Sequence, residues 1–183
     1  MTHYGGKELA AAFRTVRANT VQIAEEIPEE KYTFRAAPET RSVAQMLAHI
    51  AVATRFQTSV HADKVTDMSK LNFGALFQEF SAEENKPRSK AELIAVLKSG
   101  GDTFASFLEG LDDAFLSEQV TLPPGAQPPS KSRFEMLLSA KEHEMHHRGQ
   151  LMLIERMLGL VPHLTRQMQE RMAAMMPAGQ AQR

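Results

Sequence analysis

The sequence predicts an all-α fold, a bundle of long helices around a single core. Apolar residues recur at steps of three and four in four long segments, which is the period of an amphipathic helix. Proline and glycine interrupt the chain between these segments, and no segment shows the alternation of a half-buried strand. A chain of 183 residues has the length of one domain, which we expect to span residues 1–183.

The first helix is predicted from Lys7 to about Glu26. Thr20 fills the one gap in its apolar face. The apolar positions of that face are Leu9, Phe13, Val16, Ile23 and Ile27. Pro28 ends the helix because proline lacks the backbone N–H that a further turn needs. Residues 28–41 show no sustained period and are expected to form a loop.

The second helix is predicted to open at Ser42, which forms a capping box with Gln45, and to run to about His61. His49 lies on its inward face, whereas His61 lies at the helix end and is expected to be solvated. The neighbours of His49 on that face are Gln45, Val52, Ala53, Phe56 and Val60. Residues 64–88 mix polar positions with a short apolar patch, which predicts a connector with one short helix.

Ser89 and Glu92 form a second capping box, which predicts the start of the third long helix. Its apolar stripe consists of Leu93, Leu97, Phe104, Phe107, Leu108 and Leu111. Gly100 and Gly101 interrupt the stripe and indicate either close helix packing or room for a ligand. Residues 112–132 contain two pairs of prolines and are expected to form a long loop.

The fourth long helix is predicted from about Ser132 to Leu158, with Gly159 and Pro162 just beyond its end. A short fifth helix is expected after Pro162. Its apolar stripe is Leu164, Met168, Met172, Met175 and Met176. Methionine stripes are typical of adaptable packing or of contacts in a homodimer.

Composition excludes several classes of function. The net charge is −1 and the basic residues are scattered, so nucleic acid is not an expected partner. The absence of cysteine excludes disulfides and protein-thiol nucleophiles, and any metal must have nitrogen and oxygen ligands. No apolar run is long enough for a signal peptide or a membrane span. We therefore expect a soluble, cytoplasmic protein that acts on a small molecule.

The segment richest in possible metal ligands is His143–Gln150, inside the fourth helix. His143 and His147 are one helical turn apart, so both can approach one ion from the same side. At about 100° per residue, they share a face with Met136, Ala140, Gln150, Ile154, Met157 and Leu158. This face predicts that the pair points into the core, while His146 lies on the neighbouring face.

Two readings of the buried pair remain open. Buried imidazole nitrogens cost free energy unless they have partners, and these can be a divalent cation or the hydrogen-bonding groups of an ordinary core. Glu144 and Arg148 have the spacing of an ion pair, and together with Glu155 they are predicted to lie at the surface. Glu144 is also the nearest candidate for a catalytic base, and Gln150 can orient a ligand or a metal-binding histidine.

His143–His147 also satisfies the HExxH pattern of zinc proteases. The longer form of this pattern, with a glycine and a third histidine further on, is not present. Gly149 lies two residues past the second histidine instead of three, and no third histidine follows in register. Glu170 is conceivable as a third ligand. Such proteases present a strand edge to the peptide, and the sequence predicts no strand, so we favour His49 as the third ligand.

Two segments, Ser42–His49 and His143 with His147–Leu151, resemble the DinB-like superfamily, also called YfiT-like metal-dependent enzymes. The resemblance covers nearly the whole chain. It implies an up-down-down-up four-helix bundle in which His49, His143 and His147 bind a divalent metal, often zinc or nickel, with open positions for substrate. Members often carry a tryptophan where this chain has Arg41, so the lining of that end of the bundle departs from the family pattern.

The resemblance also implies a first function for the site, and two alternatives stay open. Related families include transferases and isomerases that use a low-molecular-weight thiol, which a divalent metal would activate as thiolate. The first expectation is therefore a thiol transferase. The alternatives are a hydrolase that activates water at the same centre and a stress-associated metal-binding bundle without turnover.

Overall fold

The computed structural model of the protein describes residues 4–175. Four long helices form its body: α1 (Gly6–Glu26), α2 (Val43–Ala62), α4 (Lys90–Glu109) and α6 (Arg133–Met157). The elements between and after them are η1 (Glu29–Lys31), η2 (Met68–Lys70), α3 (Phe73–Asn85), α5 (Asp113–Ser117), β1 (Gln119–Thr121), β2 (Ser130–Ser132) and α7 (His163–Met175).

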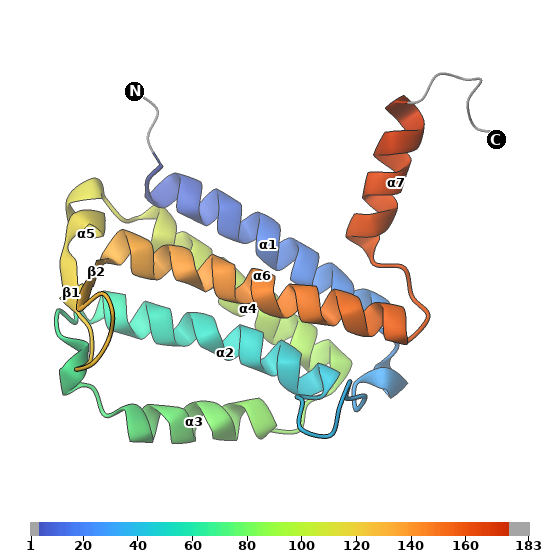
Figure 1. The fold of residues 1–183 in the computed structure, drawn as a ribbon, viewed down its shortest axis with the longest axis horizontal. Coiled ribbons are helices and arrows are strands. Elements are labelled where there is room, and N and C mark those ends of the chain that lie inside the picture. The colour runs from blue at the N-terminus through green and yellow to red at the C-terminus, as the bar shows by residue number, and fades with distance from the viewer. Residues whose placement is uncertain (1–3, 176–183) are drawn as a thin grey trace.

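The bundle has the predicted topology. Helices α1 and α6 run in one direction and α2 and α4 in the other (Figure 1), so their order along the chain is up-down-down-up. α1 packs against α4 and α6, and α2 packs against the same two helices from the other side. The prediction of an all-α four-helix bundle with an additional C-terminal helix is confirmed.

Side-chain hydrogen bonds at the N-cap fix where three of these helices, α2, α4 and α6, begin. Ser42 with Gln45 and Ser89 with Glu92 both form the predicted capping boxes, and the Ser132 side chain accepts a hydrogen bond from the backbone N–H of Glu135. Each cap satisfies backbone donors that the first turn leaves unpaired. The helix starts were therefore readable from short sequence signals.

Two apolar clusters fill the bundle. One joins the end of α1 to the start of α2 and the end of α6, around Ile23, Leu47 and Leu151. The other joins the start of α1 to the end of α4 and the start of α6, around Phe13 and Phe104. The charged residues Arg17 and Glu144, 4% and 1% exposed, are buried as well. The interior is thus not uniformly apolar.

Gly101 serves close packing. A Cβ atom at this position would lie 2.7 Å from Cγ of Arg17, so the glycine makes room for the arginine side chain. Helix α4 continues through both glycines. Of the two interpretations offered for the glycine pair, close packing holds at Gly101, and the room is filled by Arg17 rather than by a ligand.

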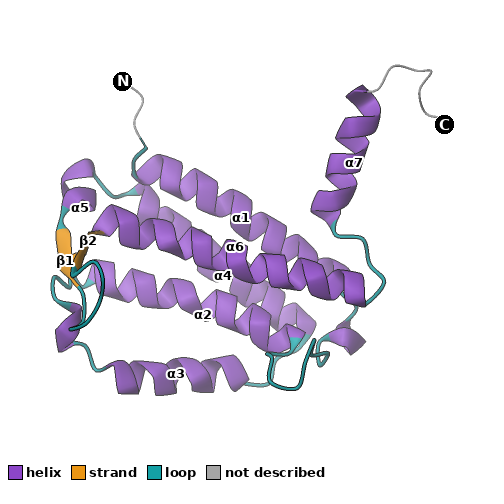
Figure 2. Ribbon diagram, in the orientation of Figure 1, coloured by secondary structure: helices purple, strands orange, loops and turns teal. Residues whose placement is uncertain are grey.

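The region 112–132 contains structure that the sequence did not reveal. Strands β1 and β2 pair antiparallel at one end of the bundle (Figure 2), whereas we predicted no strand. Each has three residues, which is too short for alternation to be visible. The buried side chain of Val120 holds the hairpin to the bundle.

His61 is another correction, because it is buried rather than solvated, with 1% exposure. Its Nδ1 lies 3.2 Å from Nη1 of Arg133, the first residue of α6. Burial is the main reason that the pKa of His61 falls to about 4, and the Arg133 charge adds to it. The partner is 72 residues away in the chain, so helix position alone could not reveal it.

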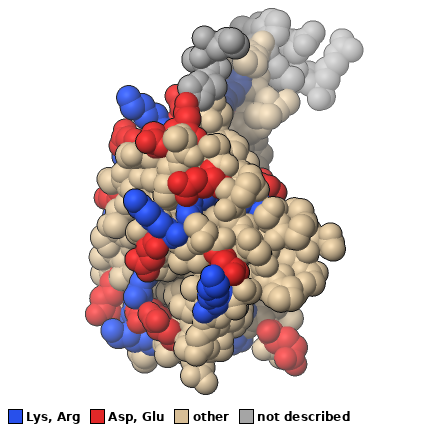
Figure 3. Space-filling view, turned by 90° about the vertical axis from the view of Figure 1, so that its left-hand side faces the viewer, with Lys and Arg blue, Asp and Glu red and all other residues tan. Residues whose placement is uncertain are grey.

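The predicted fifth helix is α7, which extends away from the bundle (Figure 1). Its methionines are exposed: Met168, Met172 and Met175. Met176 lies outside the described residues, and dimerisation through this stripe stays a prediction. In the described part of the chain, no helix has the length and apolarity to cross a bilayer. Charges of both signs are interspersed on the face that Figure 3 shows.

Glu155 leads to a prediction about pH and stability. It is fully buried, and neither carboxylate oxygen has a hydrogen-bond partner among the described residues, so its predicted surface position is wrong. Burial, with the nearby Glu26 charge, raises the pKa of Glu155 to about 7. Folding thus favours the neutral acid, and the stability that this group contributes is lost as the pH rises through 7.

We expect Glu155→Gln to stabilise the protein at pH 8 by up to about 3 kcal/mol and to have little effect at pH 4.5. Urea denaturation at the two pH values measures the difference. Glu170→Gln, an exposed change on α7, is the control. An equal effect of Glu155→Gln at both pH values would contradict the raised pKa.

Candidate metal centre

Three histidines from two helices meet at the middle of the bundle's side. His49 comes from α2, and His143 and His147 come from successive turns of α6. Their ligand atoms all lie within 4.8 Å of one another, and they form the group of possible metal ligands found in the described part of the chain. His147 is buried, and the other two are half-buried. The residues singled out by spacing are therefore together in space.

The Nε2 atoms of the three rings face one another. Nε2 of His143 lies 3.0 Å from Nε2 of His49 and 3.1 Å from Nε2 of His147. Two nitrogens bound to one tetrahedral zinc at about 2.0–2.1 Å lie about 3.3 Å apart. The spacing of the nitrogens therefore matches that of metal ligands.

The outer nitrogens of two rings have acceptors. Nδ1 of His49 lies 3.0 Å from Oε2 of Glu84, and Nδ1 of His147 lies 2.8 Å from Oε1 of Gln150. An acceptor at Nδ1 places the proton there, which leaves the Nε2 lone pair directed at the centre. Metal-binding histidines generally have such a partner, so the site has the arrangement that a divalent cation requires.

The charge state of the rings is also suitable. Burial is the main cause that lowers the pKa of all three histidines, that of His143 to about 4. The rings are therefore neutral at pH 7. Neutral lone-pair nitrogens this close repel one another unless a proton or a cation lies between them, and a divalent metal supplies that cation.

Glu84 is a site residue that the sequence analysis missed. It lies near the end of α3, and its second oxygen accepts a hydrogen bond from Nε of Arg41 at 2.6 Å. Arg41 thus forms an ion pair with Glu84 beside His49. No local pattern in residues 64–88 marks Glu84, because its role depends on the packing of α3 against α2.

Glu144 is not at the surface and does not pair with Arg148. Both of its carboxylate oxygens accept hydrogen bonds from Arg17, at 2.9–3.1 Å. Nη1 of Arg17 donates to the Leu97 carbonyl at 2.7 Å. The carboxylate thus ties α6 to α1 and α4, and this pairing occupies the group that the sequence suggested as a base.

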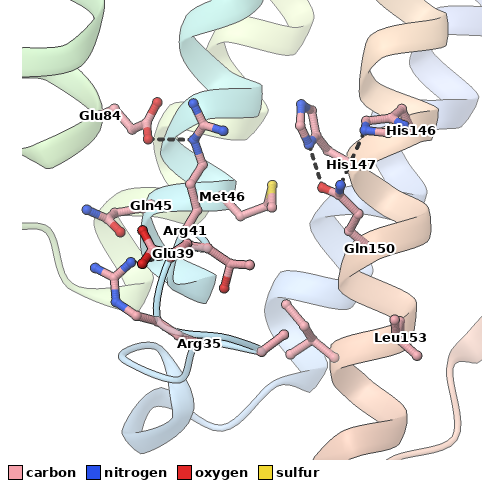
Figure 4. A pocket seen from close by; sticks show the side chains of 13 residues that line it. Arg35, Glu39, Arg41, Gln45, Met46, Glu84, His146, His147, Gln150 and Leu153 are labelled. Atoms are coloured by element: carbon pink, nitrogen blue, oxygen red, sulfur yellow. Dashed lines mark hydrogen bonds and ion pairs between the residues drawn. The ribbon is translucent and has the colours of Figure 1, made fainter.

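Gln150 and Met157, predicted to face inward, are exposed, although the Gln150 amide still reaches His147 (Figure 4). Its Nε2 lies 3.2 Å from Nε2 of His146, which is itself exposed. Glu170, the conceivable third ligand of a zinc protease, is exposed on α7 and is not in the histidine group.

Two pockets meet at the histidines. One pocket of about 760 Å³, called the polar pocket here because charged side chains lie in its lining, includes Arg35, Arg41, Glu84 and His147 (Figure 4). A second pocket of about 610 Å³ is mainly apolar and reaches His49 and His143 from the other direction along α2 and α6. The candidate centre is therefore accessible from two sides.

Comparison with known proteins decides the family. The family model of the DinB superfamily matches residues 12–151. The chain belongs to the DinB superfamily. The matched region contains all three histidines and most of the bundle, so the resemblance inferred from the motifs is confirmed.

Several DinB relatives have similar sequences or structures. The protein YjoA of Bacillus subtilis (strain 168) is 23% identical over 155 residues, which cover 83% of this chain and 90% of YjoA. Its crystal structure, of a DinB-like protein, has a TM-score of 0.62, 22% identity and coverage of 83% and 92% of the two chains.

Two further solved structures share the DinB fold. YfiT from Bacillus subtilis, a probable metal-dependent hydrolase with an unusual four-helix bundle topology, has a TM-score of 0.68, 13% identity and coverage of 87% and 91%. A mycothiol-dependent maleylpyruvate isomerase has a TM-score of 0.61, 14% identity and coverage of 82% of this chain and 63% of the isomerase. At these identities the likeness establishes the fold alone.

Proposed function

We propose that this DinB-family protein is an enzyme in which His49, His143 and His147 hold one divalent metal, zinc or nickel, and that it transfers a low-molecular-weight thiol to an electrophilic substrate. The observation that carries the proposal is the convergence of three Nε2 atoms between two pockets. Three protein ligands with open access are typical of catalytic rather than structural metal sites.

The thiol supplies a nucleophile that the chain lacks, since it contains no cysteine. When bound, a divalent metal lowers the pKa of a coordinated thiol so that the thiolate is present at neutral pH. In the net reaction the thiol proton passes to solvent and sulfur bonds to the electrophilic carbon. The leaving group departs with the electron pair of its bond.

The chain's own residues orient the centre and bind the cosubstrate. Glu84 and Gln150 hold His49 and His147 in the required tautomers. In the polar pocket, Arg41 is ion-paired with Glu84, whereas Arg35 donates to the backbone carbonyl of Thr40. Arg35 is therefore the group available to a carboxylate of the thiol cosubstrate.

Hydrolysis is the second candidate, because the structurally similar YfiT is a probable metal-dependent hydrolase. It requires a base to accept a proton from water. Glu144 is the base that the sequence suggested, and its carboxylate is engaged by Arg17 with both oxygens. This pairing favours thiol transfer, in which the proton can be lost to solvent from the acidified thiol.

The test is a screen of the protein purified without chelator or histidine tag and reconstituted with zinc or nickel. Thiols such as bacillithiol, mycothiol, coenzyme A and cysteine are incubated with aryl and alkyl halides and epoxides, and thiol loss and product mass are measured. Metal-dependent conjugation supports the proposal. Hydrolysis of esters or amides without thiol would show that the protein is a hydrolase instead. Metal binding without any turnover would show that it is a non-catalytic metal-binding bundle.

Glu84 leads to a prediction about metal affinity. Glu84→Ala removes the acceptor at Nδ1 of His49 and should weaken zinc binding about 10- to 100-fold. Competition with a fluorescent chelator measures the change. Glu83→Ala is the matched control, since Glu83 precedes Glu84 on α3 and pairs with Arg88 instead. Equal zinc affinity in the two variants would remove Glu84 from the site.

A further inference from the structure

The second pocket at the histidines has a chemistry of its own. Its walls come from α2, α3, α6 and the loop after β1, and they include the aromatic residues Phe56, Phe73, Phe77 and Phe80. Glu144 is the carboxylate in its lining, and the Arg17 charge compensates it. The volume of about 610 Å³ is that of a small-molecule site. An uncharged, largely apolar molecule fits this lining.

Helix α3 leaves its apolar face incompletely covered. None of its 13 residues is buried, and Phe77 is 69% exposed. The helix lies alongside α2 (Figure 1), and the ring of Phe80 meets Phe56 edge to face at a centroid distance of 5.9 Å. A helix of this length depends on packing for its stability, so a ligand between α3 and the bundle would stabilise it.

Gln57 adds one polar feature to the pocket. Its side-chain oxygen is buried and has no hydrogen-bond partner in the part of the chain that the structure describes. An unpaired buried acceptor costs free energy that a donor on a ligand would recover. The preferred ligand therefore combines an apolar body with one hydrogen-bond donor.

We infer that the apolar pocket between α2, α3 and α6 binds the electrophilic substrate of this enzyme as an uncharged aromatic or aliphatic molecule, with Gln57 accepting a hydrogen bond from it and α3 packing over it. The inference rests on the proposed function, and it assigns the two pockets to two reactants. The apolar reactant approaches from the side of His49 and His143, and the polar thiol from the side of His147.

The probe for this site is N-phenyl-1-naphthylamine, an uncharged two-ring molecule with one N–H donor whose fluorescence rises in apolar surroundings. It is titrated into the protein, both as purified and after removal of metal. We expect saturable binding to one site and slower hydrogen exchange in residues 73–85 when the probe is bound.

Two variants locate the probe. Phe77→Asp, a change at an exposed position, should weaken binding about tenfold without unfolding the protein, because it places a charge at the pocket wall. Leu153→Asp is the matched control, since Leu153 is 58% exposed and borders the polar pocket instead. Gln57→Leu should weaken binding of the probe about fivefold and leave its N-methylated analogue, which has no donor, unaffected.

The outcomes separate this inference from the proposed function. Absence of saturable binding, or equal weakening by Phe77→Asp and Leu153→Asp, would overturn the assignment of the apolar pocket. Because the titration needs neither metal nor thiol, probe binding at the pocket would support the assignment even if no thiol transfer were found. Thiol transfer confined to polar electrophiles, without probe binding, would overturn this inference alone.

Discussion

Replacing His147 with alanine is expected to abolish stoichiometric binding of a divalent metal. In the wild type, Nε2 of His143 lies 3.0 Å from Nε2 of His49 and 3.1 Å from Nε2 of His147, and we expect the three neutral rings to bind zinc with sub-micromolar affinity. Removing one ligand leaves two, and the dissociation constant should rise above about 100 µM. His49→Ala and His143→Ala should have the same effect, because each ring supplies one of three equivalent ligands.

Elemental analysis of the proteins, purified without chelator or histidine tag, measures the loss. His146→Ala is the matched control, because His146 neighbours His147 on α6 but is not in the group of possible metal ligands. Its ring packs edge to face against His147, and its Nε2 contacts the Gln150 amide. This variant should retain about one equivalent of metal. Binding that persists in His147→Ala would refute the three-histidine assignment.

Failure of the wild-type protein to bind metal, even after reconstitution, would contradict the metal site itself. The three rings would then be structural, held by Glu84, Gln150 and one another. In that case the enzyme proposal would give way to a binding protein. Metal content of the wild type should therefore be measured before any search for activity.

The three histidines could be predicted because helical geometry relates spacing to position. His143 and His147 share a face by the four-residue spacing, and the apolar neighbours of His49 place it on an inward face as well. The helix starts were equally readable, since capping depends on residues three apart. Local rules sufficed for the three histidines and the capping residues, although the same helical geometry placed Gln150 and Met157 inward and both are exposed.

Contacts between distant segments could not be predicted in this way. Local spacing paired Glu144 with Arg148, but its partner Arg17 is 127 residues away. Glu84 and His49 meet only because α3 packs against α2, and a single sequence gives no register for that packing. The errors at His61, Glu84 and Glu144 therefore concern polar residues whose partners lie on other helices. The error at Glu144 changes the expected chemistry.

Replacing Arg17 with alanine should destabilise the protein by about 3–5 kcal/mol, because it would leave the Glu144 carboxylate buried and unpaired. The side chains of the two residues are 5% and 2% exposed. Arg17 also contacts the Phe13 ring, at 5.1 Å from its centroid, and donates to the Leu97 carbonyl. Urea denaturation monitored by circular dichroism measures the free energy of unfolding.

Arg14→Ala is the matched control, because Arg14 is one turn earlier on α1 and pairs with Glu109 at 2.7 Å on the exposed surface. It should leave the urea midpoint nearly unchanged, since solvent screens exposed ion pairs. The double variant of Arg17→Met and Glu144→Leu should recover most of the lost stability, because apolar groups of similar size leave no charge buried.

The same variants separate the two roles considered for Glu144. If this carboxylate were the base of an HExxH protease, Glu144→Gln would abolish turnover at little cost in stability. If Glu144 is instead the partner of Arg17, Glu144→Gln should lower the urea midpoint, because the buried guanidinium loses its counter-charge. The urea midpoints of Arg17→Ala and Glu144→Gln should both lie below that of Arg14→Ala. If both equal it, the Arg17–Glu144 ion pair does not hold α6 to α1.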